Sequence, residues 1–217
     1  MTAQAMCLPT GIDDLKPVLD NAVRYGADHI NLQPNVRPRS WWDAIRTLEG
    51  WLRLSQEAGV PVHIETHRDR MTSDLFFTLD LLRAMPDLRL TADLSHYVVA
   101  REFPDPPRAE NEADVRTILD RSHAFHGRVA GPGQIQLPLS FPQHRGWVDR
   151  FLGWWEYGFR SWLRRAGPDD VLTFTCELGP RPYAITDAAG MDLSDRWTDA
   201  LLLRDLIRDR WGRVGAD

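Results

Sequence analysis

Two hydrophobic patterns alternate along this chain. Short segments with apolar residues at every second position are typical of β-strands, and longer segments with apolar residues at three- and four-residue steps are typical of amphipathic helices. We predict strands at 28–33, 60–68, 88–93, 125–129 and 171–177. Because strands and helices follow one another strictly, the pattern predicts parallel βαβ units, arranged as a barrel or as an open doubly wound sheet.

Capping residues mark the helix boundaries. Ser40, with Asp43 three residues later, begins a helix that stops at Gly59. The other predicted helices cover 12–25, about 74–85, 112–121, 147–166 and a last segment that begins after Ser194. The helix over 147–166 carries an aromatic stripe, which we interpret as core packing. The irregular segment 130–146 before it is long enough to be a candidate lid.

The strand 60–68, with the sequence VPVHIETHR, has one apolar face and one polar face. His63, Glu65 and His67 share the polar face, although a strand buried on both sides normally reads as a continuous apolar run. A site at the carboxyl end of the strand explains this pattern. Pairing of Glu65 with an arginine, with both histidines hydrogen-bonded or facing solvent, explains it equally well.

Four successive strands each carry an ionisable residue near their carboxyl end, namely Glu65, Asp93, His126 and Glu177. In a barrel these four ends converge. Three carboxylates and one imidazole suit a divalent cation such as Mn²⁺, Mg²⁺ or Co²⁺, with Zn²⁺ as a further option. We expect such a cation, since burying these groups together without one is costly.

Several segments resemble the sugar phosphate isomerase/epimerase family, whose fold is the xylose isomerase-like TIM barrel. The segments are HIETHR at 63–68, LTADLSH at 90–96, HGRV at 126–129 and FTCELGP at 174–180, followed by Pro182 and Tyr183. The resemblance runs from about Ala3 to the last helix. It implies the same four metal ligands, and it implies that Glu65 and Glu177 also transfer protons beside a substrate carbonyl, through an enediolate.

The chain departs from the family pattern at two places. It begins near the third strand of the family, at about 2–8, so we expect a partial barrel of five or six strands that lacks the first two β/α units and forms a single domain over 1–217. In the HxHxRV pattern of the family, Ala124 replaces the first histidine, and His123 is displaced to face the outer helices. An incomplete sheet exposes its edges, which predicts possible homo-oligomerisation.

Substrate contacts are expected from four further residues. His67 and Arg68 follow Glu65 where the strand becomes a loop, a position suited to a substrate hydroxyl or phosphate. His96 resembles the substrate-contacting histidine of the family. Arg128 shares the inward side of its strand with His126, and its expected role is to neutralise a carboxylate or to bind a sugar oxygen. Cys176 alternates with Glu177 and should face away from the site.

Composition narrows the functional classes. The chain has 217 residues, 43% of them hydrophobic, with a net charge of −5. This charge argues against nucleic acid as a partner, no segment has the apolar length of a membrane span, and the amino terminus is unlike a signal peptide, so we expect a cytoplasmic protein. Cys7 and Cys176 are expected to be buried thiols.

The sequence therefore predicts a metal-dependent sugar or sugar-phosphate isomerase or epimerase with a small sugar or polyol substrate, active if the barrel is complete or is completed by association. Two alternatives stay open. One is an inactive truncated barrel or binding module. The other is an endonuclease IV-like metallohydrolase, which normally has more histidines and a basic surface.

Overall fold

The computed structural model describes residues 3–215, and the chain divides after Thr91 into two compact units. Each unit alternates strands with helices. The strands follow the order β1-β2-β3-β4-β5-β6, in which neighbours in the sheet are also neighbours in sequence. This order confirms the predicted fold class, a partial TIM-like (β/α) barrel with parallel strands.

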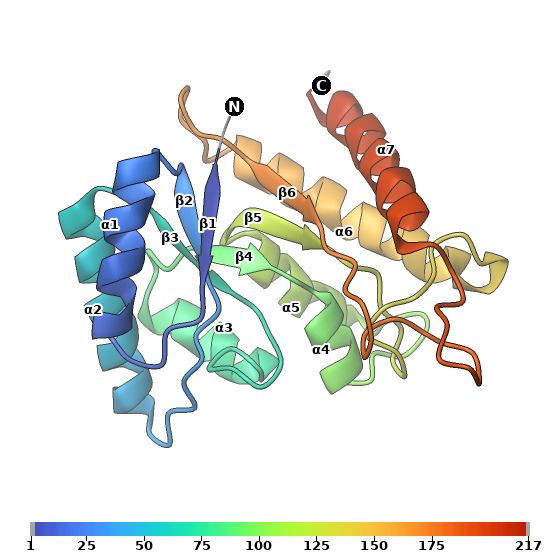
Figure 1. Ribbon diagram of the computed structural model, residues 1–217, viewed down its shortest axis with the longest axis horizontal. Coiled ribbons are helices and arrows are strands. Elements are labelled where there is room, and N and C mark those ends of the chain that lie inside the picture. Colours follow the sequence, from blue (N-terminus) through green and yellow to red (C-terminus); the bar gives the residue numbers. More distant parts are fainter. Residues whose placement is uncertain (1–2, 216–217) are drawn as a thin grey trace. The chain divides into compact units, whose positions relative to one another are not determined.

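The first unit contains the strands β1 (Gln4–Cys7), β2 (His29–Leu32) and β3 (Val62–Glu65) and the beginning of β4 (Leu90–Ala92), together with the helices α1 (Lys16–Tyr25), α2 (Trp41–Ala58) and α3 (Leu75–Ala84). The strands pair in parallel, with Asn31 opposite His63 and Glu65 opposite Thr91. Helices α1 and α2 lie on the same side of β1 and β2 (Figure 1).

The helix boundaries of this unit follow from local hydrogen bonds. The Ser40 hydroxyl accepts a hydrogen bond from the Asp43 amide at 3.1 Å, and Asp74 caps α3 through the Phe77 amide at 2.8 Å. Gly59 ends α2 with a φ of 69°, a left-handed conformation that glycine adopts without the steric cost of a Cβ. These caps confirm the boundaries predicted from the sequence.

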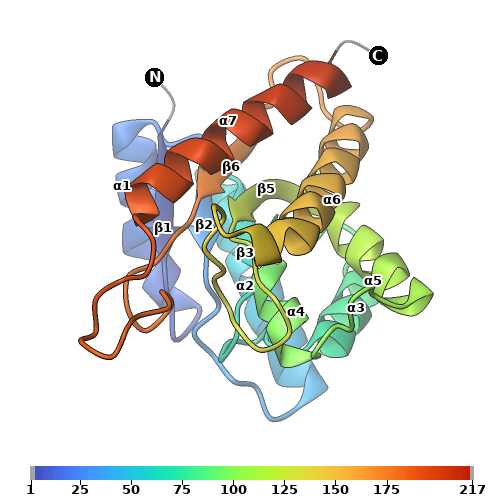
Figure 2. The same cartoon turned by 90° about the vertical axis from the view of Figure 1, so that its right-hand side faces the viewer.

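The second unit contains the strands β5 (Ser122–Gly127) and β6 (Thr173–Cys176) and the helices α4 (Ser95–Ala100), α5 (Ala109–Leu119), α6 (Arg145–Leu163) and α7 (Arg196–Val214). β5 and β6 are parallel, with His126 opposite Thr175. β6 runs beside α6, drawn in gold, and α7, drawn in red (Figure 2).

Aromatic rings fill the space between α6 and these two strands. The rings of Phe159 and Phe125 meet edge to face with their centroids 5.5 Å apart, and those of Trp155 and Phe174 at 5.1 Å. Gly158 allows this approach, because a Cβ there would lie 2.7 Å from the Phe125 ring. The aromatic stripe is therefore core, as predicted. His123 faces outward and lies 2.9 Å from Arg165, just beyond α6.

The structure corrects several of the predicted elements, among them the strand predicted at 125–129, which is β5 at Ser122–Gly127. Asp195, not Ser194, caps α7, since its carboxylate accepts the Thr198 amide at 2.8 Å. The helix α4 was missed because its N-cap, Leu94, gives no capping signal in the sequence. β3 ends at Glu65 rather than extending to residue 68, and the Glu65 carbonyl accepts the Thr72 hydroxyl of the following loop at 2.6 Å.

Within residues 3–215, no helix is both long enough and apolar enough to cross a lipid bilayer. The single-domain assignment and the possible homo-oligomer stay predictions.

Candidate metal and substrate site

Glu65, the last residue of β3, is fully buried and bound by amides of its own unit. Its carboxylate accepts hydrogen bonds from Asn31 Nδ2 at 2.5 Å and from Gln33 Nε2 at 2.9 Å. Asn31 lies in β2 and Gln33 directly after it, so the two residues project from the same side of the strand. Neutral donors thus replace part of the water that a buried carboxylate loses.

The loop after β3 holds His67 in a defined orientation. The Thr72 hydroxyl donates to the Glu65 carbonyl at 2.6 Å and accepts the His67 amide at 3.2 Å. His67 Nδ1 lies 2.6 Å from the Arg68 carbonyl, so Nδ1 carries the proton and Nε2 is the ligand atom of the neutral ring. Ligand atoms of Glu65 and His67 lie within 4.8 Å of each other.

His63 lies two residues before Glu65 in β3, and His29 lies two residues before Asn31 in β2. Both histidines therefore belong to the same polar face. Their rings stack with a centroid distance of 4.5 Å and an interplanar angle of 24°, and both side chains are buried. The stack gives His29 a packing role beside His63.

In the second unit, Asp93 is fully buried directly after β4. One carboxylate oxygen accepts the Ser95 amide at 3.0 Å and the Ser95 hydroxyl, and so satisfies the first turn of α4. The other oxygen lies 3.3 Å from Arg128 Nε and 3.4 Å from His96 Nε2. Asp93 is therefore in contact with two of the predicted substrate-binding residues.

His126 and Glu177 meet across β5 and β6. His126 Nδ1 lies 2.6 Å from one Glu177 oxygen, and a terminal guanidinium nitrogen of Arg128 lies 2.6 Å from the other. The strand register produces this arrangement, because the Glu177 amide donates to the Gly127 carbonyl at 3.0 Å. Gly127 alternates with His126 and Arg128, and a Cβ there would lie 2.3 Å from the Phe174 ring.

In the cluster of Asp93, His126, Arg128 and Glu177, neighbouring opposite charges favour the ionised forms of Glu177 and Arg128. Burial alone would raise the pKa of Glu177, but His126 and Arg128 outweigh it and lower this pKa to about 2. Burial acts to lower the pKa of Arg128, but Asp93 and Glu177 more than compensate and raise it. Glu177 is therefore a carboxylate and Arg128 a guanidinium cation at neutral pH.

Arg128 provides part of the compensation that the sequence analysis expected from a metal. The carboxylates were expected to need a metal as compensation, whereas a guanidinium that is 1% exposed already bridges Asp93 and Glu177. Of the two roles expected for Arg128, the structure contains the first, neutralisation of carboxylates. The contact depends on pairing between segments distant in sequence, which the strand pattern of Arg128 alone did not specify.

Two further residues were missed. Tyr183 stacks on Arg128, with the guanidinium carbon 4.4 Å from the ring centroid. Gln136 binds the Gly179 backbone twice, at 2.8 and 3.0 Å, and thereby attaches the segment 130–146 to the residues that follow β6. Gln136 is buried in a segment that was predicted as a loop. Its position between two apolar residues, Ile135 and Leu137, was the signal in the sequence that could have indicated its burial.

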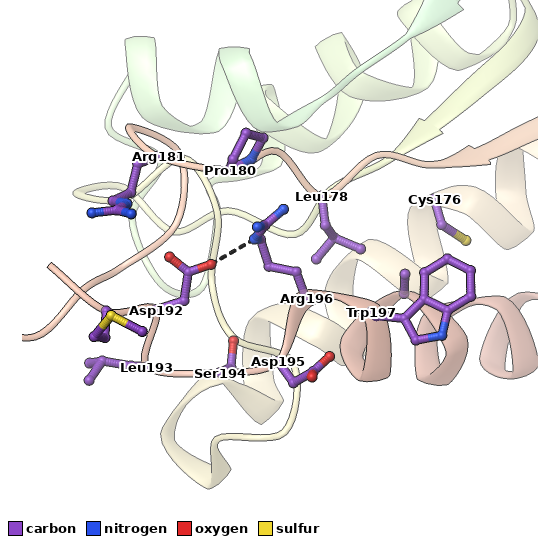
Figure 3. Close-up of a pocket in the computed structure, with 12 residues that line it drawn as sticks. Cys176, Leu178, Pro180, Arg181, Asp192, Leu193, Ser194, Asp195, Arg196 and Trp197 are labelled. Atoms are coloured by element: carbon purple, nitrogen blue, oxygen red, sulfur yellow. Dashed lines mark hydrogen bonds and ion pairs between the residues drawn. The ribbon is translucent and has the colours of Figure 1, made fainter.

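A separate cavity of about 1040 Å³ is lined by the end of β6, the segment that follows it and the start of α7 (Figure 3). Cys176 and Leu178 line it together with the start of α7, including Arg196, which pairs with Asp192 at 2.7 Å. Because Cys176 and Leu178 flank Glu177 in the strand alternation, this cavity is distinct from the Asp93 cluster. Cys176 faces α7, which agrees with its predicted orientation away from the site.

Comparison with known proteins identifies the fold. A xylose isomerase-like TIM barrel protein from Mycobacterium smegmatis, solved in complex with magnesium, matches with a TM-score of 0.53 over 90% of this chain and 67% of that protein, at 14% sequence identity. This chain has the xylose isomerase-like TIM-barrel fold. The segments around Glu65, Asp93 and His126 indicated the same barrel from the sequence.

Endonuclease IV from Thermus thermophilus aligns with this chain at a TM-score of 0.49 and 16% identity, over 96% of this chain and 76% of that protein. No family model and no curated protein matches the sequence. The comparisons thus establish the fold, and the roles of individual site residues stay predictions.

Within the xylose isomerase-like fold, the predicted residues fall into two groups. Glu65, His67 and Arg68 belong to the first unit, and the second unit contains the remaining five, namely Asp93, His96, His126, Arg128 and Glu177. Within the second group, Asp93 and Glu177 are linked through Arg128, and His126 contacts Glu177 directly.

Proposed function

We propose that this protein is a divalent-metal-dependent isomerase or epimerase of a small sugar, sugar phosphate or related polyol. The observation that supports it most is the cluster of the second unit, in which Asp93, His126 and Glu177 gather at the ends of successive parallel strands. Ligands of parallel α/β proteins bind at this end of the strands.

The chemistry of the donor set fits a divalent cation. Two carboxylates and an imidazole are ligands that Mg²⁺, Mn²⁺ and Co²⁺ accept, and His126 Nδ1 and Glu177 Oε2 are close enough to share one ion. In the second unit we assign Asp93, His126 and Glu177 as ligands, and Glu65 of the first unit stays the fourth ligand that the sequence predicts. The magnesium in the Mycobacterium smegmatis structure supports the proposal of a divalent cation. When bound, the cation would polarise the carbonyl and hydroxyl oxygens of the substrate.

Isomerisation and epimerisation both require removal of a proton from the carbon beside a carbonyl. We assign this transfer to Glu65 and Glu177, each held by hydrogen bonds or ion pairs within its own unit. A carboxylate with a pKa near 2 is a weak base, so Glu177 becomes an effective one only when the cations around it are rearranged.

Positively charged and hydrogen-bonding side chains orient the substrate in this proposal. His96, beside Asp93, and Arg128 would bind hydroxyl groups near the reacting carbon. His67 and Arg68, in the loop after β3, would bind the distal hydroxyl or phosphate. The buried position of His96 suits a contact inside the site, while Arg68 is only half-buried.

Solvent exchange tests the proposal. We expect the protein, supplied with Mg²⁺ or Mn²⁺ and a panel of aldoses, ketoses and their phosphates in D₂O, to incorporate deuterium beside the carbonyl of at least one substrate. Glu177→Gln or Glu65→Gln should lower the exchange rate by at least 10²-fold, the typical contribution of a positioned acid or base. Proton NMR of the substrate measures the rate.

Glu156→Gln is the matched control, since this glutamate pairs with Arg210 between α6 and α7 and should leave exchange unchanged. Exchange retained in both site variants would exclude Glu65 and Glu177 as the acid/base pair. One observation favours the alternative of an inactive barrel or binding module, namely that Arg128 already satisfies Asp93 and Glu177. Absence of exchange with every substrate and both metals would favour that alternative.

A further inference from the structure

We infer that Arg128 is an internal cation that competes with the divalent metal for Asp93 and Glu177, so that metal binding requires the guanidinium to leave these carboxylates. This inference rests on the metal site of the proposed function. It adds a residue that lowers the affinity of the site for the metal, whereas a ligand raises this affinity.

The contacts of Arg128 support this competition. Its Nε lies 3.3 Å from Asp93 Oδ2 and one terminal nitrogen lies 2.6 Å from Glu177 Oε1, so a single planar group bridges both proposed ligands. Arginine keeps its charge at any relevant pH, so the bridge cannot be released by loss of a proton. It can be released only by movement of the side chain.

The metal and the guanidinium would compete for the same charge and for the same atoms. Asp93, Glu177 and the guanidinium together carry one negative charge, before any charge on His126 is counted. A divalent cation bound to Asp93 would need the oxygen that the guanidinium contacts, Oδ2, because Oδ1 already accepts the Ser95 amide and hydroxyl, and Arg128 there is 1% exposed. Like charges repel strongly where water is excluded, so metal and guanidinium cannot share both carboxylates.

Tyr183 provides a second partner for the displaced group. The Arg128 guanidinium carbon already lies 4.4 Å from the centre of the Tyr183 ring, and Gln134 Nε2 donates to the Tyr183 carbonyl at 3.1 Å. An aromatic face stabilises a guanidinium without neutralising it. Tyr183 is therefore a positioning residue that keeps Arg128 beside the site after the carboxylates are released.

The affinity of the site for a metal distinguishes competition by Arg128 from a purely structural role of Arg128. If Arg128 competes, Arg128→Met should bind Mn²⁺ at least tenfold more tightly than the unmodified chain in isothermal titration calorimetry. If Arg128 instead orients the carboxylates for the metal, the variant should bind more weakly. The matched control is Arg150→Met, because Arg150 also bridges two carboxylates, those of Asp105 and Glu112, away from the cluster. Its affinity for Mn²⁺ should be unchanged.

Arg128→Met leaves the buried Asp93 and the half-buried Glu177 without their shared cation and can fail to fold without metal. A second measurement therefore uses the unmodified chain with ¹⁵N-labelled arginine, in which the Nε–H signal of Arg128 is assigned by its loss in Arg128→Lys. Saturating Mg²⁺ should shift this signal and accelerate its exchange with water, and the Arg150 signal should not move.

Equal or weaker Mn²⁺ binding by Arg128→Met, or an Arg128 signal unmoved at saturating Mg²⁺, would overturn the inference while leaving the proposed metal site in place. If neither the unmodified chain nor Arg128→Met binds Mn²⁺ or Mg²⁺, the inference and the proposed metal site both fail. Tighter binding by Arg128→Met with an unchanged Arg150→Met supports the inference.

Discussion

At the scale of single residues, the site depends on polar partners rather than on the carboxylates alone. Glu65 is fully buried, and amide donors from the neighbouring strand hold it in place. In the other unit an arginine and a histidine have this role for Glu177. A buried carboxylate that loses a partner keeps most of its desolvation cost, so these partners are as necessary to the folded state as the apolar core.

The shortest of these contacts gives a stability prediction. Asn31→Leu should lower the free energy of unfolding by about 1–3 kcal/mol, because the Glu65 carboxylate stays buried with one amide donor fewer. Urea denaturation at pH 7 measures this change. In a Glu65→Met background the same substitution should cost less than half as much. An equal cost in both backgrounds would show that Asn31 stabilises the unit through packing instead.

At the scale of elements, α6 and α7 are connected by an ion pair as well as by aromatic packing. Arg210 of α7 lies 2.8 Å from Glu156 of α6, and the Phe159 and Trp211 rings meet edge to face at 5.5 Å. Hydrogen bonding by Arg210 lowers the pKa of Glu156 despite an opposing effect of burial. The ion pair therefore contributes stability whenever Glu156 is ionised.

Removal of Arg210 should accordingly have a pH-dependent effect. Because the folded-state pKa of Glu156 is lowered, its contribution is complete above the unfolded value of 4.5 and is lost as the pH falls through the folded pKa. Arg210→Gln should cost about 0.5–1 kcal/mol at pH 7 and much less at pH 3, as measured by urea denaturation. Arg213→Gln, which removes an exposed pair within α7, should cost less at pH 7. A cost for Arg210→Gln that is equal at both pH values would contradict the ion-pair explanation.

At the scale of the whole molecule, the proposed metal connects binding to folding. A ligand that binds only the folded chain stabilises it by mass action, by about 2.7 kcal/mol at a hundred times its dissociation constant. For a chain of this size that energy corresponds to a rise in Tm of roughly 5–11 °C. Differential scanning calorimetry with Mg²⁺, Mn²⁺ or Co²⁺ should show this rise, and a chelator should reverse it.

Asp93→Asn is the informative variant for this experiment, since it removes a charge from the proposed ligand set and should abolish most of the metal-dependent rise. Elemental analysis of the purified protein provides an independent measurement. A melting temperature unchanged by all three ions, with no bound metal detected, would argue against a metal site of any composition.

The sequence by itself determined the features that depend on near neighbours along the chain. The strand and helix periods, the cap at Ser40 and the left-handed end at Gly59 follow from hydrogen bonds within a few residues. The opposite orientation of Cys176 and Glu177 follows from the two-residue period of a strand. The same two-residue period identified Glu65, His126 and Glu177 as residues of the polar strand faces before their contacts were known.

Only the tertiary structure decided which groups neutralise those residues. Asn31 reaches Glu65, and Arg128 bridges Asp93 and Glu177, across separations in sequence that strand register alone brings together. Local periodicity specifies the side of a strand on which a residue lies, whereas its partner depends on how the strands are aligned with one another.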